Sequence, residues 1–124
     1  QPPGGYIYQD EYWLVCHAPV NKGSLGTLFI ESRRHLLDFA EMNADETASY
    51  GVLLNKVYAA LKPLTGAERI YLVAMMEGIA HFHSWLVPRQ PAIDERGVAF
   101  LAKDLTCELA EAEKLSIALR ERLS

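Results

Sequence analysis

The sequence predicts an α+β domain with a mostly antiparallel sheet of five strands, a central helix and a long C-terminal helix. Two groups of segments, one before residue 32 and one between residues 69 and 87, are rich in the aromatic and β-branched residues that favour strands. The stretch between them, and another near the end of the chain, has apolar residues every three or four positions, which is typical of a helix with one buried face.

The three early strands are predicted at residues 6–8, 12–18 and 25–31. The polar residues 9–11 separate the first two strands and predict a hairpin between them. Residues 19–24 contain proline and glycine, so we expect a loop before the third strand.

The central helix is predicted to begin at Asn43, because Asn43 and Glu46 have the spacing of a capping box. Pro63 and Gly66 are predicted to end this helix. Its apolar stripe consists of Tyr50, Leu53, Leu54, Val57, Tyr58 and Leu61.

The two late strands are predicted at residues 69–76 and 80–87, joined by a tight turn at Glu77 and Gly78. They are close enough in the chain to be antiparallel neighbours. From about Gly97 to Leu123 the apolar spacing predicts one long helix. Its buried face consists of Leu101, Leu105, Leu109, Ala112, Leu115 and Leu119.

With 124 residues, the chain has the size of a single domain. We expect residues 1–5 to be a flexible lead, residues 6–89 to form the core, and residues 90–124 to form a connector and a helix packed on the same domain. Lys and Arg number 12 against 16 Asp and Glu, which gives a net charge of −4. Nucleic-acid binding needs many clustered cations, and a membrane span needs about 20 apolar residues, so we expect neither partner. A small anionic ligand remains compatible with this charge.

The two cysteines, Cys16 and Cys107, lie far apart and form no CxxC motif. We interpret them as free thiols in a reducing compartment rather than as a disulfide or zinc ligands. No segment has the charged and apolar regions of a signal peptide, so we expect a cytoplasmic protein.

Two histidines separated by one residue lie within the predicted strand 80–87. Side chains alternate along a strand, so His81, His83 and Trp85 are expected on one face, about 6.6 Å apart, with Ser84 on the other. Arg89 follows the strand, and together these groups form a candidate anion site. A neutral imidazole is a nucleophile when its other ring nitrogen is held as a hydrogen-bond donor.

Other interpretations of the two histidines are open at this point. They are either packed or surface residues without chemistry, or a metal-binding pair. A metal needs a third or fourth ligand, and His17, His35 and Glu77 are the only candidates by strand order. This set is too loose, so we expect no metal and no cofactor.

Three segments resemble the histidine triad (HIT) superfamily. Residues 80–89, Ala-His-Phe-His-Ser-Trp-Leu-Val-Pro-Arg, are similar to its signature of alternating histidines on a strand followed by apolar residues and Pro-Arg. Residues 25–35 resemble the family's glycine-containing strand and Arg-His turn, and residues 36–62 resemble the helix that follows. The resemblance covers residues 6–89 in matching order.

The resemblance implies a HIT-like fold that forms a homodimer and binds a purine nucleotide or nucleoside phosphate derivative. Family members hydrolyse or transfer nucleoside monophosphate groups through a histidine that attacks the α-phosphate. By position, His83 matches this nucleophile and His81 the supporting histidine. We therefore expect a hydrolase or transferase, with a non-catalytic nucleotide-binding or dimeric interaction module as the alternative.

The nucleotide-binding positions also follow from the resemblance. Glu77, Gly78 and Ile79 match the phosphate loop, where backbone N–H groups meet phosphate oxygens. Phe29 lines the base and ribose pocket by analogy, together with Tyr8 and Leu14, although core packing is the favoured role for Tyr8 and Phe29 individually. The full set of expected nucleotide-binding residues is Glu77, Gly78, Ile79, Arg89, Thr27 and Phe29.

Three positions depart from the family pattern. Trp85 replaces the third histidine, Thr27 stands where histidine commonly follows the glycine of the third strand, and Glu77 puts a carboxylate near the expected phosphate. A positioned proton donor contributes about 10²- to 10⁴-fold to a rate, so we expect slow turnover. Trp85 is expected to stack on a base, to donate its indole N–H, or to fill the space of the missing histidine.

Arg33, Arg34 and His35 form the compact basic cluster of the chain. We interpret this cluster either as a solvated turn or as a contact for a phosphate or a partner.

Overall fold

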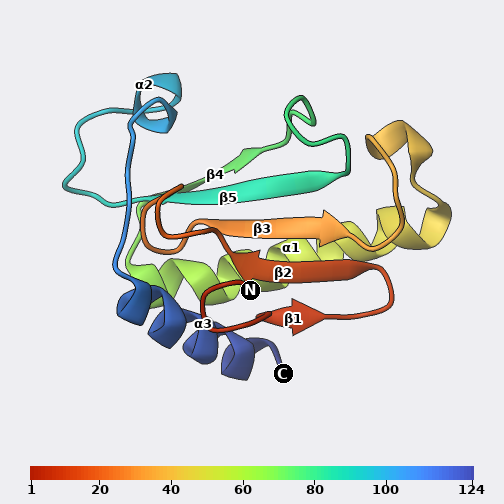
Figure 1. The fold of residues 1–124 in the computed structure, drawn as a ribbon, viewed down its shortest axis with the longest axis horizontal. Helices are drawn as coiled ribbons and strands as arrows, with labels where there is room; N and C mark the ends of the chain where they lie inside the picture. Colours follow the sequence, from red (N-terminus) through yellow and green to blue (C-terminus); the bar gives the residue numbers. More distant parts are fainter.

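The protein is described by a computed structural model of all 124 residues. Its centre is a single five-stranded sheet in the order β1-β2-β3-β5-β4, in which every neighbouring pair is antiparallel (Figure 1). The strands are β1 (Tyr8–Gln9), β2 (Trp13–His17), β3 (Leu28–Ser32), β4 (Arg69–Val73) and β5 (His83–Arg89). The predicted α+β class and the five-stranded antiparallel sheet are confirmed.

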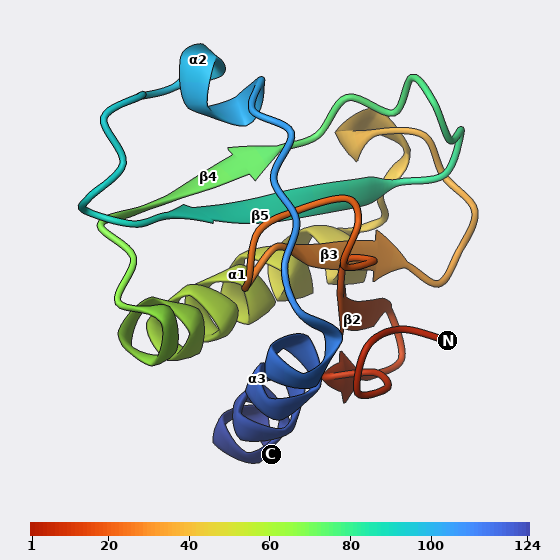
Figure 2. The same cartoon turned by 60° about the vertical axis from the view of Figure 1, so that its left-hand side comes forward.

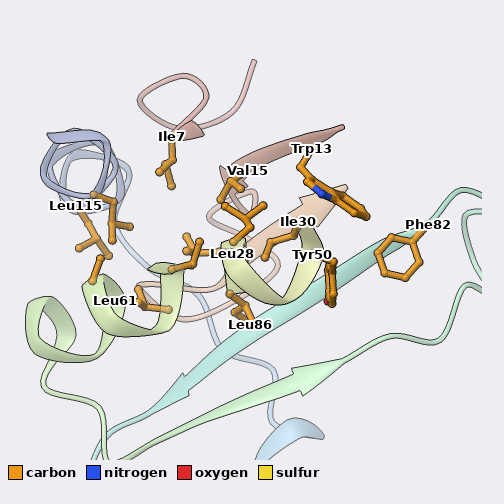
Figure 3. Close-up of a cluster of buried hydrophobic side chains, with 14 of the residues drawn as sticks. Ile7, Trp13, Val15, Leu28, Ile30, Tyr50, Leu61, Phe82, Leu86 and Leu115 are labelled. Atoms are coloured by element: carbon orange, nitrogen blue, oxygen red, sulfur yellow. The ribbon is translucent and has the colours of Figure 1, made fainter. Parts of the chain in front are cut away.

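One face of the sheet is covered by helix α1 (Ala44–Thr65), and the core lies between them (Figure 3). Trp13 and Phe82 are fully buried there, with their ring centroids 5.9 Å apart, and the Tyr50 ring contacts both. Along β5, Ser84 and Leu86 are buried in the core, so His83, Trp85 and Val87 point to the opposite face of the sheet.

Helix α1 begins with the predicted capping box, in which the Asn43 side chain accepts from the Glu46 N–H and the Glu46 carboxylate accepts from the Asn43 N–H. The prediction that Pro63 ends the helix is wrong, because the helix continues to Thr65. Pro63 has no backbone N–H and therefore lacks one hydrogen bond of the helix. The last turn is nevertheless stabilised by the Thr65 hydroxyl, which donates to the Leu61 carbonyl (2.8 Å), so the helix continues past Pro63. Gly66 then ends the helix with φ 71°, as predicted.

The predicted helix over residues 97–123 is wrong as a single element. The chain instead forms the short helix α2 (Val98–Leu101) and the helix α3 (Leu109–Leu123), separated by seven non-helical residues. Figure 2 shows α2 near β4 and β5 at one end of the sheet and α3 beside α1 at the other. Tertiary contacts override the helical pattern: Phe100 is buried against Tyr71, and the Cys107 N–H donates to the Val20 carbonyl (3.0 Å).

Both cysteines are free thiols. Cys16 is buried, and the burial raises the pKa of its thiol to about 12, so this thiol stays protonated. None of the helices combines the length and the apolar character needed to cross a bilayer.

His17 is a buried structural histidine at the end of β2. Its Nδ1 lies 2.8 Å from the Ala18 carbonyl oxygen, and its Nε2 accepts a hydrogen bond from the Gly26 N–H at 2.9 Å. The ring is therefore neutral with the proton on Nδ1. Its burial lowers the pKa of His17, and its two bonds hold the loop between β2 and β3 against the sheet.

We predict that His17 makes the fold less stable in mild acid. Because its pKa is lower in the folded state, the unfolded chain binds the proton first as the pH falls below about 6.5. The free energy of unfolding then decreases by up to about 1.4 kcal/mol per pH unit from this residue. Urea unfolding of the wild type and of His17→Gln between pH 7.5 and 5 measures the difference. Parallel pH dependences in the two proteins would contradict the prediction.

Candidate functional site

The sheet face opposite α1 carries the predicted motif. Phe29 lies opposite Trp85 and Glu31 opposite His83 in the register of β3 and β5. The Phe29 and Trp85 rings meet edge to face, with centroids 4.5 Å apart. Ser84 points the other way into the core and accepts a hydrogen bond from the Tyr50 hydroxyl (2.8 Å), so the predicted alternation of side chains along this strand is confirmed.

His83 is held in one tautomer by a backbone carbonyl. Its Nδ1 lies 2.8 Å from the carbonyl oxygen of His81. A carbonyl oxygen only accepts hydrogen bonds, so Nδ1 carries the proton and Nε2 is left with a free lone pair. This is the state that a histidine needs in order to act as a nucleophile at neutral pH.

His81 lies just before the strand and not within it, so the predicted start of this strand at residue 80 is wrong. Its Nε2 is 2.6 Å from the Ser32 carbonyl oxygen and therefore carries the proton. The His81 Nδ1 is then an acceptor, and the Nδ1 of the exposed His35 lies 3.2 Å from it. The sequence places His35 in a basic turn and names it as a loose metal candidate, and the Arg-His part of the family resemblance also points to this neighbourhood.

A cleft of about 540 Å³ lies over this face of the sheet. Its walls are the loop after β4, the loop before β3, and the segment that follows Gly97. Of the predicted site residues, the cleft brings together His83, Trp85, Glu77, Gly78, Ile79 and Thr27. Phe29 lies beside Trp85 on the neighbouring strand, and His81 contacts the His83 ring through its carbonyl; neither Phe29 nor His81 lines the cleft.

The loop from Ala74 to Phe82 replaces the predicted tight turn at Glu77 and Gly78. Met76 has φ 54°, the only left-handed residue of the chain that is not glycine, and it lies in the part of this loop that lines the cleft. Glu77, Gly78 and Ile79 are exposed, and Glu77 forms no ion pair. The carboxylate of Glu77 is therefore free to turn toward solvent.

Arg89 lies at the opposite end of β5 from His83, six residues or about 20 Å along the strand. Its guanidinium is buried, forms an ion pair with Glu68 at 2.8 Å, and donates to the Tyr71 hydroxyl at 3.2 Å. The structure therefore does not bring Arg89 to the histidines.

The basic cluster after β3 does not converge on the cleft either. Arg34 pairs with the buried carboxylate of Glu46 through two nitrogens, at 2.7 and 3.1 Å. Arg33 donates to the Asp10 carbonyl and to Gln9. Both arginines thus hold neighbouring backbone and helix termini in place.

The metal candidates named from the sequence do not converge on one point, although His35 contacts His81. His17 is buried at the end of β2 that pairs with Leu28, away from His81 and His83, and Glu77 belongs to the exposed loop after β4. No group of three or more His, Cys, Asp or Glu side chains is arranged to hold a metal ion.

Comparison with solved structures identifies the fold. A histidine triad protein from Bradyrhizobium japonicum matches with a TM-score of 0.80 and 18% identity, over 96% of this chain and 90% of that one. The chain has the histidine triad (HIT) fold. No family model matches the sequence, and no curated protein does.

Two further structures share the HIT fold with this chain. A hypothetical histidine triad nucleotide-binding protein from Sulfolobus tokodaii matches with a TM-score of 0.72 and 20% identity, over 95% of this chain and 82% of that one. The diadenosine triphosphate hydrolase of Plasmodium falciparum, in complex with cyclomarin A, matches with a TM-score of 0.71 and 12% identity, over 98% and 77% of the two chains. The HIT fold, predicted from the motif segments, is therefore confirmed.

We predict that the three histidines bonded to backbone carbonyls differ in tautomer. His83 and His17 should carry the proton on Nδ1, while His81 should carry it on Nε2, because of the carbonyl that each ring meets. Long-range ¹H–¹⁵N correlation spectra at pH 8 distinguish the two forms. His17 is the internal control for His83, and an Nε2-protonated His83 would remove the basis for its role as a nucleophile.

Proposed function

We propose that this protein binds a purine nucleotide or a nucleoside phosphate derivative in the cleft, and slowly hydrolyses or transfers the nucleoside monophosphate group. The observation that carries the proposal is the hydrogen bond from His83 Nδ1 to the His81 carbonyl, which leaves the Nε2 lone pair free on a residue that lines the cleft. The HIT fold supports the same class of ligand, since the matched structures include a nucleotide-binding protein and a dinucleotide hydrolase.

The reaction proceeds in two displacements. The Nε2 lone pair of His83 attacks the α-phosphorus, a P–N bond forms, and the leaving group departs with the electron pair of its bond to phosphorus. Water or another acceptor then attacks the phosphorus, the P–N bond breaks, its electrons return to Nε2, and the proton of the acceptor passes to solvent. His81 contributes its carbonyl and positions His83 without contacting the phosphorus.

Trp85 limits the leaving groups that this site accepts. It stands on the strand two residues after His83, and its indole has one N–H donor and no acidic proton. Groups that depart without protonation are therefore favoured. Packed edge to face on Phe29, the indole offers its remaining surface to the cleft, where a base or an apolar group stacks on it.

The second candidate function is a nucleotide-binding or dimeric interaction module without catalysis. Trp85 in the place of a proton donor favours it, as does the exposed carboxylate of Glu77 in the loop where phosphate is expected. In this function the cleft binds a nucleotide and His83 forms no covalent intermediate.

We also propose that the protein acts in the cytoplasm as a homodimer. β4 is an edge strand whose outer side has no partner in the sheet, and Leu72 on it is 45% exposed. A second copy of the chain would cover this edge.

We predict that His83 becomes adenylylated. Incubation with adenosine 5′-phosphorimidazolide, followed by mass spectrometry, should show one added AMP group on the wild type and none on His83→Ala. Ser84→Ala is the matched control, because Ser84 is a neighbouring nucleophile on the buried face and its loss should leave labelling intact.

Absence of label on the wild type would contradict the catalytic proposal. A thermal shift with AMP or GMP then tests the second function, since a ligand at 100 times its Kd adds about 2.7 kcal/mol to the free energy of unfolding. Stabilisation without labelling or turnover identifies the nucleotide-binding module, and no stabilisation contradicts nucleotide binding in both functions.

We predict that Trp85→His increases turnover of an adenosine phosphoramidate whose amine must be protonated to leave. A positioned imidazolium supplies that proton, so kcat/KM should rise by about 10²- to 10⁴-fold. Trp85→Phe, which preserves an aromatic ring on Phe29, should give no increase. An equal effect of both substitutions would show that packing, and not proton donation, limits the rate.

A further inference from the structure

Two buried hydroxyl groups in the cleft have no hydrogen-bond partner. They are Ser24 Oγ and Thr27 Oγ1, and the Thr27 side chain is almost completely buried, at 1% exposure. Both residues line the cleft, in the loop that leads into β3. A buried hydroxyl without a partner destabilises a fold, so a pair of them at the wall of a cleft points to a ligand that accepts their hydrogen bonds.

The loop brings the two hydroxyls to the same place and keeps the space beside them small. The Thr27 N–H donates to the Ser24 carbonyl (3.1 Å), which closes a turn between them. Gly23 packs against Thr27, and a Cβ on Gly23 would lie 2.8 Å from the Thr27 hydroxyl oxygen. A larger residue at position 23 would therefore collide with the Thr27 side chain and displace this hydroxyl.

The charges around this end of the cleft favour an anion. Lys22 lines the cleft beside the two hydroxyls and forms no ion pair. Lys103 lies in the wall contributed by the chain after α2 and is 3.4 Å from Glu95. Because Glu95 pairs with Lys103 and Asp104 lies in the same wall, Lys22 is the lysine of the cleft that no carboxylate pairs with.

We propose that Ser24, Thr27 and Lys22 form a binding site for an oxyanion, either a carboxylate or a phosphate monoester. The two hydroxyls donate to the oxyanion and the ammonium group balances its charge. On the proposed function, on which this part rests, the oxyanion is the far end of the leaving group.

The distance to His83 defines the shape of that leaving group. Leu28 pairs with Leu86, so Thr27 lies about four residues, or about 13 Å, along β5 from His83. The cleft wall between them is apolar and includes Trp85, Val87 and Phe100. A leaving group with an apolar body and a terminal oxyanion matches this arrangement.

Titration followed by ¹H–¹⁵N spectra tests the site with three soluble probes: hexanoate, hexyl phosphate and the neutral hexanamide. We expect at least one of the two anions to bind the wild type at least 10-fold more tightly than hexanamide, and the comparison of hexanoate with hexyl phosphate identifies the preferred oxyanion. Thr27→Val and Ser24→Ala should each remove this preference. Thr47→Val, an exposed threonine on α1, is the matched control and should retain it. Equal binding of all three probes, or a preference that survives Thr27→Val, overturns the proposal.

Thermal unfolding gives an independent test. Because the Thr27 hydroxyl has no partner in the free protein, Thr27→Val should raise Tm by several degrees. A lower Tm would mean that the hydroxyl already has a partner, which overturns the proposal. AMP titrated into the wild type tests the proposed function separately. If the oxyanion probes bind and AMP does not, the oxyanion site is retained and the nucleotide function is contradicted. If AMP binds and the anionic probes show no preference over hexanamide, the nucleotide function is retained and the oxyanion site is overturned.

Discussion

The hydrogen bond between the His83 ring and the His81 backbone is the interaction on which the site depends. It sets the tautomer of His83, and it exists only because the chain holds the His81 carbonyl next to the ring. Phe82, between the two, provides the anchor: its N–H donates to the Leu36 carbonyl (2.7 Å) and its carbonyl accepts from the Ser32 N–H (3.2 Å). The Phe82 ring is buried in the core, so the packing on the α1 side of the sheet fixes the position of the His81 carbonyl on the open side.

The alternation of side chains between the two faces of β5 explains why much of the site was predictable from the sequence. Burial of Ser84 and Leu86 toward α1 leaves His83 and Trp85 on the open face, and this follows from a period of two alone. The capping box at Asn43 and the left-handed Gly66 were likewise visible as local patterns with a physical cause.

Features that depend on distant contacts were not predictable in this way. The helical spacing after Gly97 was real, but the burial of Phe100 on Tyr71 and the bond from Cys107 to Val20 interrupt the helix. Arg89 follows the motif in sequence, yet Glu68 pairs with it at the far end of the strand. Local periodicity carries no information about such partners, because they depend on which segments meet in space.

The chain segment after α2 has a consequence for how the cleft is assembled. Residues 101–105 follow the histidines in the chain and supply one wall of the cleft, and their position is set at both ends, by Phe100 on the sheet and by α3 on α1. The width of the cleft therefore depends on two packing contacts that lie outside it, Phe100 on Tyr71 and α3 on α1.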